Sequence, residues 1–341
     1  MNSGDAILLL SFGGPDRREE VLPFLENVLR GRAVPRARML AVAEHYYHFG
    51  GRSPINDQNR ALIAALREIL AAAGSPLPVY WGNRNWHPLL ADTLRQMAAD
   101  GVRRAFAFVT SAYSSYSGCR QYLEDIARAR EAVGPAAPEI LKLRVFYNHP
   151  GFIEPMADRV RAALDRFPPD RRAGAALVFT AHSIPADMAE TSRYVEQVKE
   201  ACRLVAERVR RADYRLVYQS RSGAPGQPWL GPDVLEYLRQ LASAAVSRDV
   251  ILAPIGFISD HMEVAYDLDT EAADLCRQLR LHMVRAGTVG ADPCFAAMIY
   301  ELVLEQLENV PRRFFGNLGV SQDLCPEDCC PGGRPRLSRP A

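Results

Sequence analysis

Two groups of residues far apart in the chain could handle a metal ion or a proton. His182 directly follows one apolar run, and Glu263, Asp267 and Glu271 come soon after another. The three carboxylates recur every four residues, so on a helix they drift by only about 40° per step and share one face. Like charges at this spacing repel one another. An acidic face of this kind beside a cleft indicates a path for cations or protons.

Each motif alone also has an ordinary structural interpretation. Acidic residues at helical spacing usually form a solvated face, and a histidine after a strand is often a hydrogen-bonded core residue. Taken together, the two motifs favour a functional site, because ligands of α/β sheets bind beyond the carboxyl ends of the strands. Both motifs fall at such ends.

Apolar runs of strand length alternate with amphipathic segments of helical length. The expected strands are Ile7–Leu10, Val79–Trp81, Ala105–Val109, Leu143–Phe146, Ala176–Phe179, Leu216–Tyr218 and Val250–Ala253. The expected helices are Glu19–Leu29, Asn56–Ala72, Leu89–Ala99, Tyr122–Ala132, Phe152–Phe167, Thr191–Arg211, Val234–Ala244 and Tyr266–Leu279. This alternation is typical of α/β proteins, in which helices cover both faces of a parallel sheet.

The pattern of strands and helices runs twice. It predicts two similar α/β lobes, residues 1–147 and 148–318, with a cleft between them. Polar loops that follow strands should line this cleft; they are Ser11–Pro15, Thr110–Ser117, Thr180–Pro185 and Gly256–Asp260. Residues 319–341 form a Cys-rich tail without periodicity, which we expect to be ordered only by something it binds.

Composition excludes several classes of protein. The 341 residues are 48% hydrophobic, enough for a large core, and carry a net charge of +1. No global field therefore favours nucleic acid or an anionic membrane. The start of the chain lacks a signal peptide pattern, and no apolar run reaches the roughly 18 residues of a membrane span, so we expect a soluble, cytoplasmic protein. Seven unevenly spaced cysteines do not suggest a disulfide framework.

Three loops have residues suited to a large flat ligand. Arg52 and Ser53 precede a predicted helix, where a guanidinium and exposed N–H groups would hold a carboxylate; the alternative is an ordinary helix cap. Two glycines after Phe12 let the backbone approach a flat ligand, although a structural turn explains them equally well. The segment Thr110–Tyr122 is rich in hydroxyl groups and includes Tyr116, a composition that suits an amphipathic ring system.

The tail concentrates three thiols, Cys325, Cys329 and Cys330, within six residues. Thiolates at this density bind zinc or an iron–sulfur cluster, and a fourth ligand would then come from the body of the protein. The alternative is a disordered tail with incidental cysteines, although exposed unused thiols are prone to oxidation.

Together these residues resemble ferrochelatase, the enzyme family that inserts ferrous iron into a porphyrin. The resemblance extends to about residue 318. Its matching segments are Leu8–Pro15, Gly50–Asn56, Thr110–Tyr122, Thr180–Pro185, Gln219–Asp233 and Pro254–Glu271. Ala181–Ser183 together with Ser259–Glu263 is the most specific pair. The resemblance implies two flavodoxin-like, chelatase-type lobes with parallel sheets and a porphyrin cleft.

The resemblance also implies roles for individual residues. His182 and Glu263 are the expected catalytic residues, and with Asp267 and Glu271 they are expected to handle the metal. The expected substrate-binding residues are Ser53, Tyr122, Phe12, Arg52 and Tyr116. The chemistry agrees, because iron replaces two pyrrole protons and the site needs a base and a route for protons. An imidazole with carboxylates also suits ferrous iron that must be released to the ring.

The cysteine-bearing extension is similar to that of ferrochelatases with a [2Fe–2S] cluster. This likeness implies Cys325, Cys329 and Cys330 as ligands, with one upstream thiol. We favour Cys119 as the upstream ligand because it falls in a predicted loop, and Cys294 is the alternative.

Two features bear on the substrate. Some relatives have a tyrosine in place of Phe12 that can ligate iron, a contact that phenylalanine cannot make. The Gly-Arg-Ser-Pro loop looks more like that of the bacterial type that uses coproporphyrin.

We therefore predict a cytoplasmic ferrochelatase, a metal-inserting lyase of haem biosynthesis, that inserts Fe²⁺ into a porphyrin and favours coproporphyrin III. The alternatives are protoporphyrin IX as the porphyrin, a cobalt chelatase of corrinoid synthesis, and a non-catalytic tetrapyrrole carrier or iron–sulfur redox sensor. We expect a monomer or weak dimer without a nucleic-acid partner.

Overall fold

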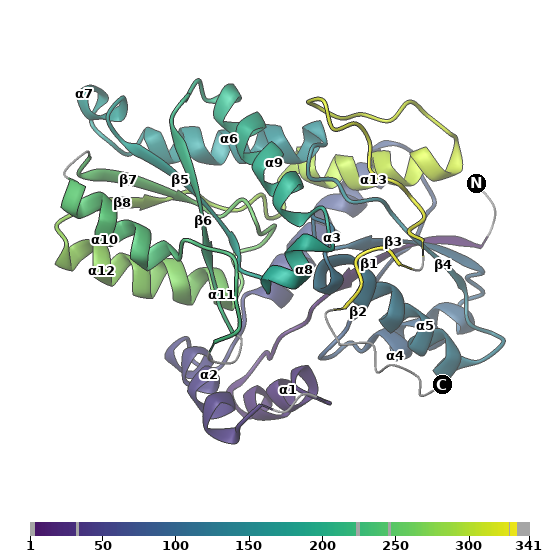
Figure 1. The fold of residues 1–341 in the computed structure, drawn as a ribbon. Coiled ribbons are helices and arrows are strands. Elements are labelled where there is room, and N and C mark those ends of the chain that lie inside the picture. Colours follow the sequence, from purple (N-terminus) through teal and green to yellow (C-terminus); the bar gives the residue numbers. More distant parts are fainter. Residues whose placement is uncertain (1–3, 32–33, 223–225, 245–246, 327, 333–341) are drawn as a thin grey trace, which may run out of the picture.

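The computed structural model describes residues 4–31, 34–222, 226–244, 247–326 and 328–332 (Figure 1). Within this part of the chain, the strands form two four-stranded parallel sheets. The N-terminal sheet has the order β2-β1-β3-β4, and the C-terminal sheet has the equivalent order β6-β5-β7-β8. The strands are β1 (Asp5–Ser11), β2 (Val79–Asn83), β3 (Arg104–Val109), β4 (Glu139–Lys142), β5 (Ala176–His182), β6 (Tyr214–Gln219), β7 (Asp249–Ala253) and β8 (His282–Arg285). The predicted fold class is confirmed.

Helices connect the strands and cover the sheets. The N-terminal helices are η1 (Arg18–Glu20), α1 (Val21–Val28), α2 (Arg36–His48), α3 (Ile55–Ala72), α4 (Leu90–Ala99), η2 (Tyr116–Arg120) and α5 (Gln121–Val133). The later helices are α6 (Pro150–Leu164), α7 (Pro169–Arg172), α8 (Ala186–Glu190), α9 (Tyr194–Arg208), α10 (Val234–Ala244), α11 (Met262–Val264), η3 (Ala265–Ala272), α12 (Ala273–Gln278) and α13 (Pro293–Leu307). Both η2 and η3 are π-helical, a form that often occurs at functional sites.

Alternate side chains of β1 pack against helices on opposite faces of the N-terminal sheet. Ile7 and Leu9 pack into a core that includes side chains of α3, whereas Leu8 and Leu10 pack with side chains of α4 and α5 on the other face. Successive side chains of a strand point to opposite faces, so an apolar run covered on both faces is the expected sequence of a buried parallel strand.

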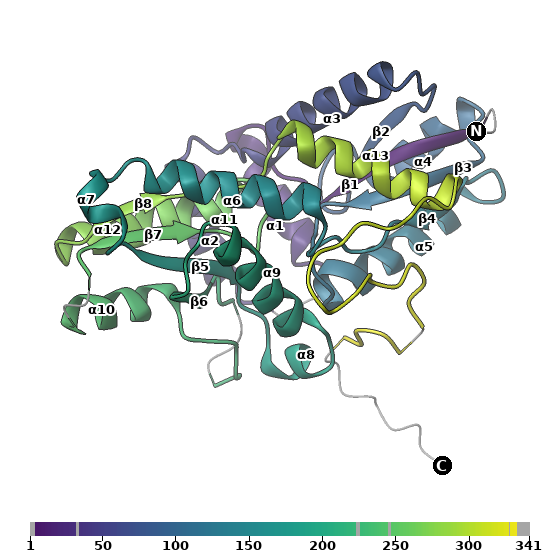
Figure 2. The same cartoon turned by 90° about the horizontal axis from the view of Figure 1, so that it is seen from above.

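The last helix links the two sheets. Figure 2 shows α13 running beside α3, and α13 also packs against α6, which contacts the C-terminal strands β7 and β8. The core between them contains buried side chains from both sheets, including Leu9 of β1 and Phe179 of β5. The cleft between the sheets is therefore supported by a shared apolar base.

Helices α1 and α2 form a small unit of their own. Val21, Phe24 and Leu25 of α1 pack against Met39 and Ala43 of α2. This pair projects from the N-terminal sheet toward α11 of the C-terminal half (Figure 1). It forms one wall of the cavity described below.

Two details of the strand prediction were wrong. The strand expected at Leu143–Phe146 is instead β4 at Glu139–Lys142, while Leu143 and Phe146 lie in the buried core without strand structure. Their apolar character comes from core burial rather than from strand pairing. The short edge strand β8 was missed because His282 and Arg285 interrupt its apolar pattern.

Among the described residues, every helix is too short or too polar to span a bilayer.

Candidate functional site

A cavity of about 1670 Å³ lies at the carboxyl ends of the strands of both sheets. This volume exceeds that of most small-molecule sites, which measure about 300–1,000 Å³. Residues from all four loops expected to line the cleft contribute to it; they include Phe12, Thr110, His182 and Ser259. The ends of parallel strands are where ligands of α/β sheets bind.

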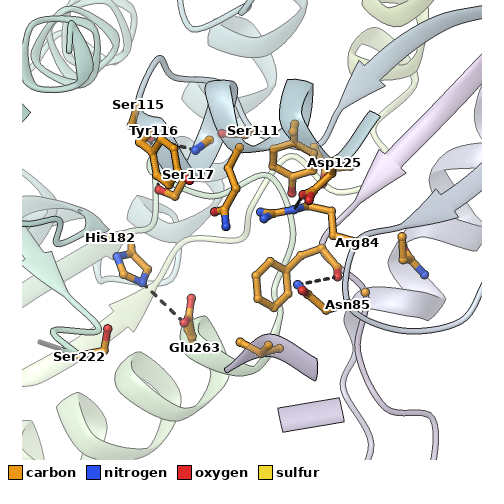
Figure 3. Close-up of a pocket in the computed structure, with 18 of the residues that line it drawn as sticks. Arg84, Asn85, Ser111, Ser115, Tyr116, Ser117, Asp125, His182, Ser222 and Glu263 are labelled. Carbon is orange, nitrogen blue, oxygen red and sulfur yellow. Dashed lines mark hydrogen bonds and ion pairs between the residues drawn. The ribbon is translucent and has the colours of Figure 1, made fainter. Parts of the chain in front are cut away.

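His182 and Glu263 face one another at this cavity (Figure 3). His182 is the last residue of β5, Glu263 lies in α11, and His182 Nε2 is 3.6 Å from Glu263 Oε1. The close approach of the loop after β7 to the end of β5 requires Gly256, since a Cβ there would lie 2.5 Å from Ala181 Cα. The two motifs singled out in the sequence are thus brought together.

Hydrogen bonds fix the orientation of the His182 ring. Its Nδ1 contacts the carbonyl oxygen of Ser183, and the Tyr194 hydroxyl donates to the carbonyl oxygen of His182 at 2.8 Å. Because a carbonyl can only accept, Nδ1 carries a proton. In the neutral ring, Nε2 therefore offers its lone pair toward Glu263 and the cavity.

The pKa values of His182 and Glu263 are both shifted from their ordinary values. Burial favours the neutral imidazole, but the charge of Glu263 and its hydrogen bond outweigh this effect and raise the pKa of His182 to about 8. Burial likewise favours the neutral acid, but His182 and His261 outweigh it and lower the pKa of Glu263 to about 2. Their side chains are 32% and 50% exposed, and both open onto the cavity. At neutral pH the arrangement is an ion pair that a ligand can reach.

The acidic face continues behind Glu263 along η3. Asp267 accepts hydrogen bonds from the Ser220 hydroxyl and, at 3.3 Å, from Gln219 Nε2. Burial raises the pKa of Asp267 to about 7 against the Ser220 hydrogen bond, and the charges of Glu263 and Glu271 add to the rise. Glu271 is exposed, and burial is also the main cause of its raised pKa. The carboxylates therefore run from the cavity toward the surface.

Four of the five expected substrate-binding residues line the cavity. Ser53, Tyr116 and Tyr122 belong to the N-terminal half, as does Phe12, a residue that is 37% exposed. Arg52 instead pairs with Asp57, its Nη2 lying 2.6 Å from Oδ2, and the described lining residues do not include it.

Arg84 is a cavity residue that the sequence analysis missed. Its guanidinium lies 4.5 Å from the ring centroid of Tyr122 and pairs with Asp125 (Figure 3). Arg84 directly follows β2, so the rule that selected the loops after the other strands would also have found it. Arg30, Arg38 and Arg128 are further arginines of the cavity.

The tail cysteines lie beside η2. Cys325 Sγ is 4.0 Å from Sγ of Cys119, a buried residue of η2, and Cys329 Sγ is 3.8 Å from Cys330 Sγ. A hydrogen bond from Cys119 lowers the pKa of Cys325 to about 5, with help from the charge of Lys142 and against the effect of burial. All seven cysteines lie within the described residues and are free thiols.

Two solved chelatase-type structures share this fold. The fold matches SirB from Bacillus subtilis with Fe³⁺ at a TM-score of 0.53 and 14% identity, over 89% of this chain and 96% of that one. The SirB sirohydrochlorin chelatase from Bacillus subtilis subspecies spizizenii, in complex with cobalt, matches at a TM-score of 0.51 and 13% identity, with the same coverage. At these identities, the likeness concerns the fold alone.

Sequence relatives identify the family. Residues 4–307 match the ferrochelatase family model. The chain is 54% identical to a ferrochelatase from Rhodopirellula baltica, over 97% of both chains. It is 51% identical to a coproporphyrin III ferrochelatase from Streptomyces coelicolor, over 97% of this chain and 94% of that one. The chain therefore belongs to the ferrochelatase family and is an enzyme that inserts ferrous iron into a porphyrin in haem synthesis.

Proposed function

We propose that coproporphyrin III is the porphyrin substrate. The relatives from Streptomyces coelicolor and Nocardia farcinica, 51% and 52% identical to this chain, are coproporphyrin III ferrochelatases. Coproporphyrin III carries four propionates, whereas protoporphyrin IX carries two propionates and two apolar vinyl groups. Four cavity arginines suit the more anionic ring; they are Arg30, Arg38, Arg84 and Arg128.

Steady-state kinetics with both porphyrins test this choice. With ferrous iron under anaerobic conditions, we expect kcat/KM to be higher for coproporphyrin III than for protoporphyrin IX. A higher kcat/KM for protoporphyrin IX would overturn the proposal but would leave the assignment to the family intact.

His182 and Glu263 are the proposed catalytic residues, and their facing geometry is the single observation that carries the mechanism. Insertion exchanges one Fe²⁺ for two pyrrole protons, so the total charge is conserved. The Glu263 carboxylate can receive the incoming cation. Once the cation replaces the imidazolium as its partner, His182 loses the charge that favours its protonated form. His182 then releases its Nε2 proton to solvent, and the neutral Nε2 is able to accept one pyrrole proton, while the second leaves along the carboxylates behind Glu263.

Asp267 and Glu271 carry protons or metal along the path behind Glu263. The raised pKa of Asp267 suits a relay, since a carboxyl group that titrates near 7 can both accept and release a proton at neutral pH. Ser53, Tyr116 and Tyr122 hold the ring from the N-terminal half, with Phe12 against its face. Phe12 has no atom that could serve as an axial ligand of iron.

A [2Fe–2S] cluster bound by Cys119, Cys325, Cys329 and Cys330 is the proposed resident cofactor. These four thiols match the number of cysteine ligands that such a cluster takes. Two thiolates on one tetrahedral metal lie about 3.8 Å apart, given metal–sulfur bonds of about 2.3 Å. The spacings of 4.0 Å and 3.8 Å are close to this value, although no described group of three or more donors already surrounds a single metal position. When bound, the cluster would supply one-electron transfer.

Optical and electron paramagnetic resonance spectra of untagged protein purified anaerobically test the cluster. We expect visible absorption from ferric sulfur centres that is lost in Cys119→Ser and kept in Cys294→Ser. Cys294 is exposed near the start of α13 and serves as the matched control. Colourless wild-type protein, or a loss that is equal in both variants, would contradict the proposal.

The two lobes are proposed to divide at residues 147 and 148, with the tail starting at 319. The supporting observation is that each of the two lobes contains one complete four-stranded sheet. Helix α13 would then belong to the second lobe in sequence while packing on α3 of the first.

A further inference from the structure

Gln58 connects the two halves of the molecule beside the cavity. Its Nε2 donates to the carbonyl oxygen of Asp260 at 3.2 Å, and its Oε1 accepts from the Asp260 backbone N–H at 2.9 Å. Gln58 lies in α3, and Asp260 lies in the loop after β7. An amide is the side-chain group that has one donor and one acceptor to match a peptide in this way.

The loop that receives this amide is also held from the opposite side. Arg285 at the end of β8 donates from Nη1 to Asp260 Oδ1 at 2.8 Å and from Nε to Asp269 Oδ1 at 2.5 Å. The backbone of Asp260 is thus fixed by the N-terminal half and its side chain by the C-terminal half. Such two-sided fixing leaves this position little freedom to move.

Glu263 follows three residues later. Between the two residues, the His261 side chain caps α11 by accepting from the Glu263 backbone N–H at 3.2 Å. The position of the Asp260 peptide therefore determines where α11 begins, and α11 places Glu263 at 3.6 Å from His182.

The other end of the connection lies at the ring-binding wall. The first turn of α3 is tied to the loop after β1, since Asn56 Nδ2 donates to the Gly14 carbonyl oxygen at 2.7 Å. The Ser53 backbone N–H donates to the Pro15 carbonyl oxygen at 2.8 Å. This loop carries Phe12, and both Phe12 and Ser53 line the cavity. Gln58 thus joins the elements that face the ring to the loop that carries the carboxylate.

We infer that Gln58 is a positioning residue for metal insertion: it couples the N-terminal half of α3 to the Asp260 peptide and so holds Glu263 in register with the porphyrin. The inference rests on the proposed role of Glu263. It predicts that Gln58 affects the use of metal more than the binding of porphyrin, because Gln58 acts through Asp260 and Glu263.

Substitution of Gln58 by methionine and by glutamate tests the inference. Gln58→Met keeps the size and removes both hydrogen bonds, whereas Gln58→Glu keeps the acceptor for the Asp260 N–H and places a carboxylate against the carbonyl. Gln240→Met is the matched control, since Gln240 is exposed on α10 and its side chain bonds only to Glu236 among the described residues. The measurements are kcat, the KM for ferrous iron, the porphyrin Kd from fluorescence quenching, and Tm.

We expect kcat of Gln58→Met to fall about tenfold and its KM for iron to rise about threefold, because small displacements of reacting groups are costly. The porphyrin Kd should change by less than about twofold. Gln58→Glu should show the same split, because its carboxylate faces the Asp260 carbonyl oxygen without a proton to donate. If Gln58→Met fails to fold, Gln58→Glu provides the test: its kcat should fall while its porphyrin Kd stays nearly unchanged.

Wild-type kinetics in Gln58→Met, or an equal loss in Gln240→Met, would overturn the inference. A loss of porphyrin affinity that matches the loss of kcat would also overturn it, because that pattern is expected of general structural damage. Glu263→Gln, assayed in parallel, separates the two proposals. A fully active Glu263→Gln would contradict the proposed catalytic role of Glu263. If Glu263→Gln is impaired while Gln58→Met is fully active, only the positioning role of Gln58 is contradicted.

Discussion

The two sheets share one strand order but end in different chemistry. At the carboxyl ends of β1 and β3, the cavity is lined by Phe12 and by a hydroxyl-rich segment with Tyr116. At the carboxyl ends of β5 and β7, the corresponding loops carry His182 and lead into Glu263. The comparison teaches that one scaffold, used twice, can present two kinds of chemistry to one cavity. In the proposed roles, the first sheet binds the ring and the second exchanges metal for protons.

Electrostatics follow the same division. In the N-terminal half, Arg84 and Arg128 share the single carboxylate of Asp125, which leaves a net positive charge beside the ring site. In the C-terminal half, the pair of His182 and Glu263 has pKa values of about 8 and about 2, while Asp267 has a pKa of about 7. Groups that titrate near neutrality thus gather at one side of the cavity, as proton exchange requires.

The largest effect is expected for Glu263→Gln, which removes a charge from the catalytic side. Insertion should slow by about 10²–10³-fold, in the range of lost acid–base catalysis, while the porphyrin Kd stays within about twofold. Anaerobic insertion assays and fluorescence quenching measure the two quantities. Glu236→Gln, on the exposed face of α10, is the control. Full activity of Glu263→Gln would contradict the assignment of catalysis to the C-terminal half.

The reverse pattern is expected for Arg84→Met in the ring-binding half. Loss of a charged hydrogen-bond donor costs about 1.5 kcal/mol or more, so the porphyrin Kd should weaken about tenfold. The kcat at saturating porphyrin should stay within about threefold. Arg52→Met is the matched control, because Arg52 pairs with Asp57 outside the described cavity lining. A larger loss of affinity in Arg52→Met would shift the binding role to that residue.

A smaller effect is expected for Asp267→Asn on the proton route. Its pKa of about 7 means that its ability to accept a proton rises as pH increases through 7. Insertion at pH 7 should fall about threefold to tenfold, and the rise of wild-type activity through this pH should flatten. Activity profiles of wild type, Asp267→Asn and the exposed Asp274→Asn test this prediction. An unchanged profile in Asp267→Asn would remove Asp267 from the route.

The smallest expected effect is on stability. The pKa of His182 is raised in the folded protein, so its pairing with Glu263 stabilises the fold fully below the ordinary pKa of about 6.5. This contribution is lost as pH rises through about 8. The Tm of wild type should therefore exceed that of Glu263→Gln between pH 5 and 6.5, and the two values should converge above pH 8. A constant difference over this range would show that the pair does not titrate as described.

The sequence was sufficient to predict the fold class and the meeting of the two motifs. Buried parallel strands produce apolar runs, and the carboxyl-end rule places the residues after β5 and β7 at one cleft. The rule works because it depends on chain direction rather than on side-chain packing.

Other features depended on contacts that the sequence does not encode locally. The apolar run Leu143–Phe146 reads as a strand because burial in a core and burial in a sheet leave the same pattern. The connection of Gln58 to Asp260 joins segments 202 residues apart. Arg84, in contrast, directly follows β2 and was within reach of the carboxyl-end rule. The placement of Cys119 beside Cys325 likewise requires the fold of the tail.

The most direct test of the division between the two halves compares His182→Ala with Ser53→Ala in the same two measurements, porphyrin Kd and single-turnover insertion rate. We expect His182→Ala to bind porphyrin within about twofold of wild type and to lose about 10³-fold or more in insertion. Ser53→Ala, in contrast, should weaken binding severalfold and leave insertion at saturation nearly intact. A His182→Ala variant that inserts iron at the wild-type rate, or that loses porphyrin binding in step with insertion, would contradict the account.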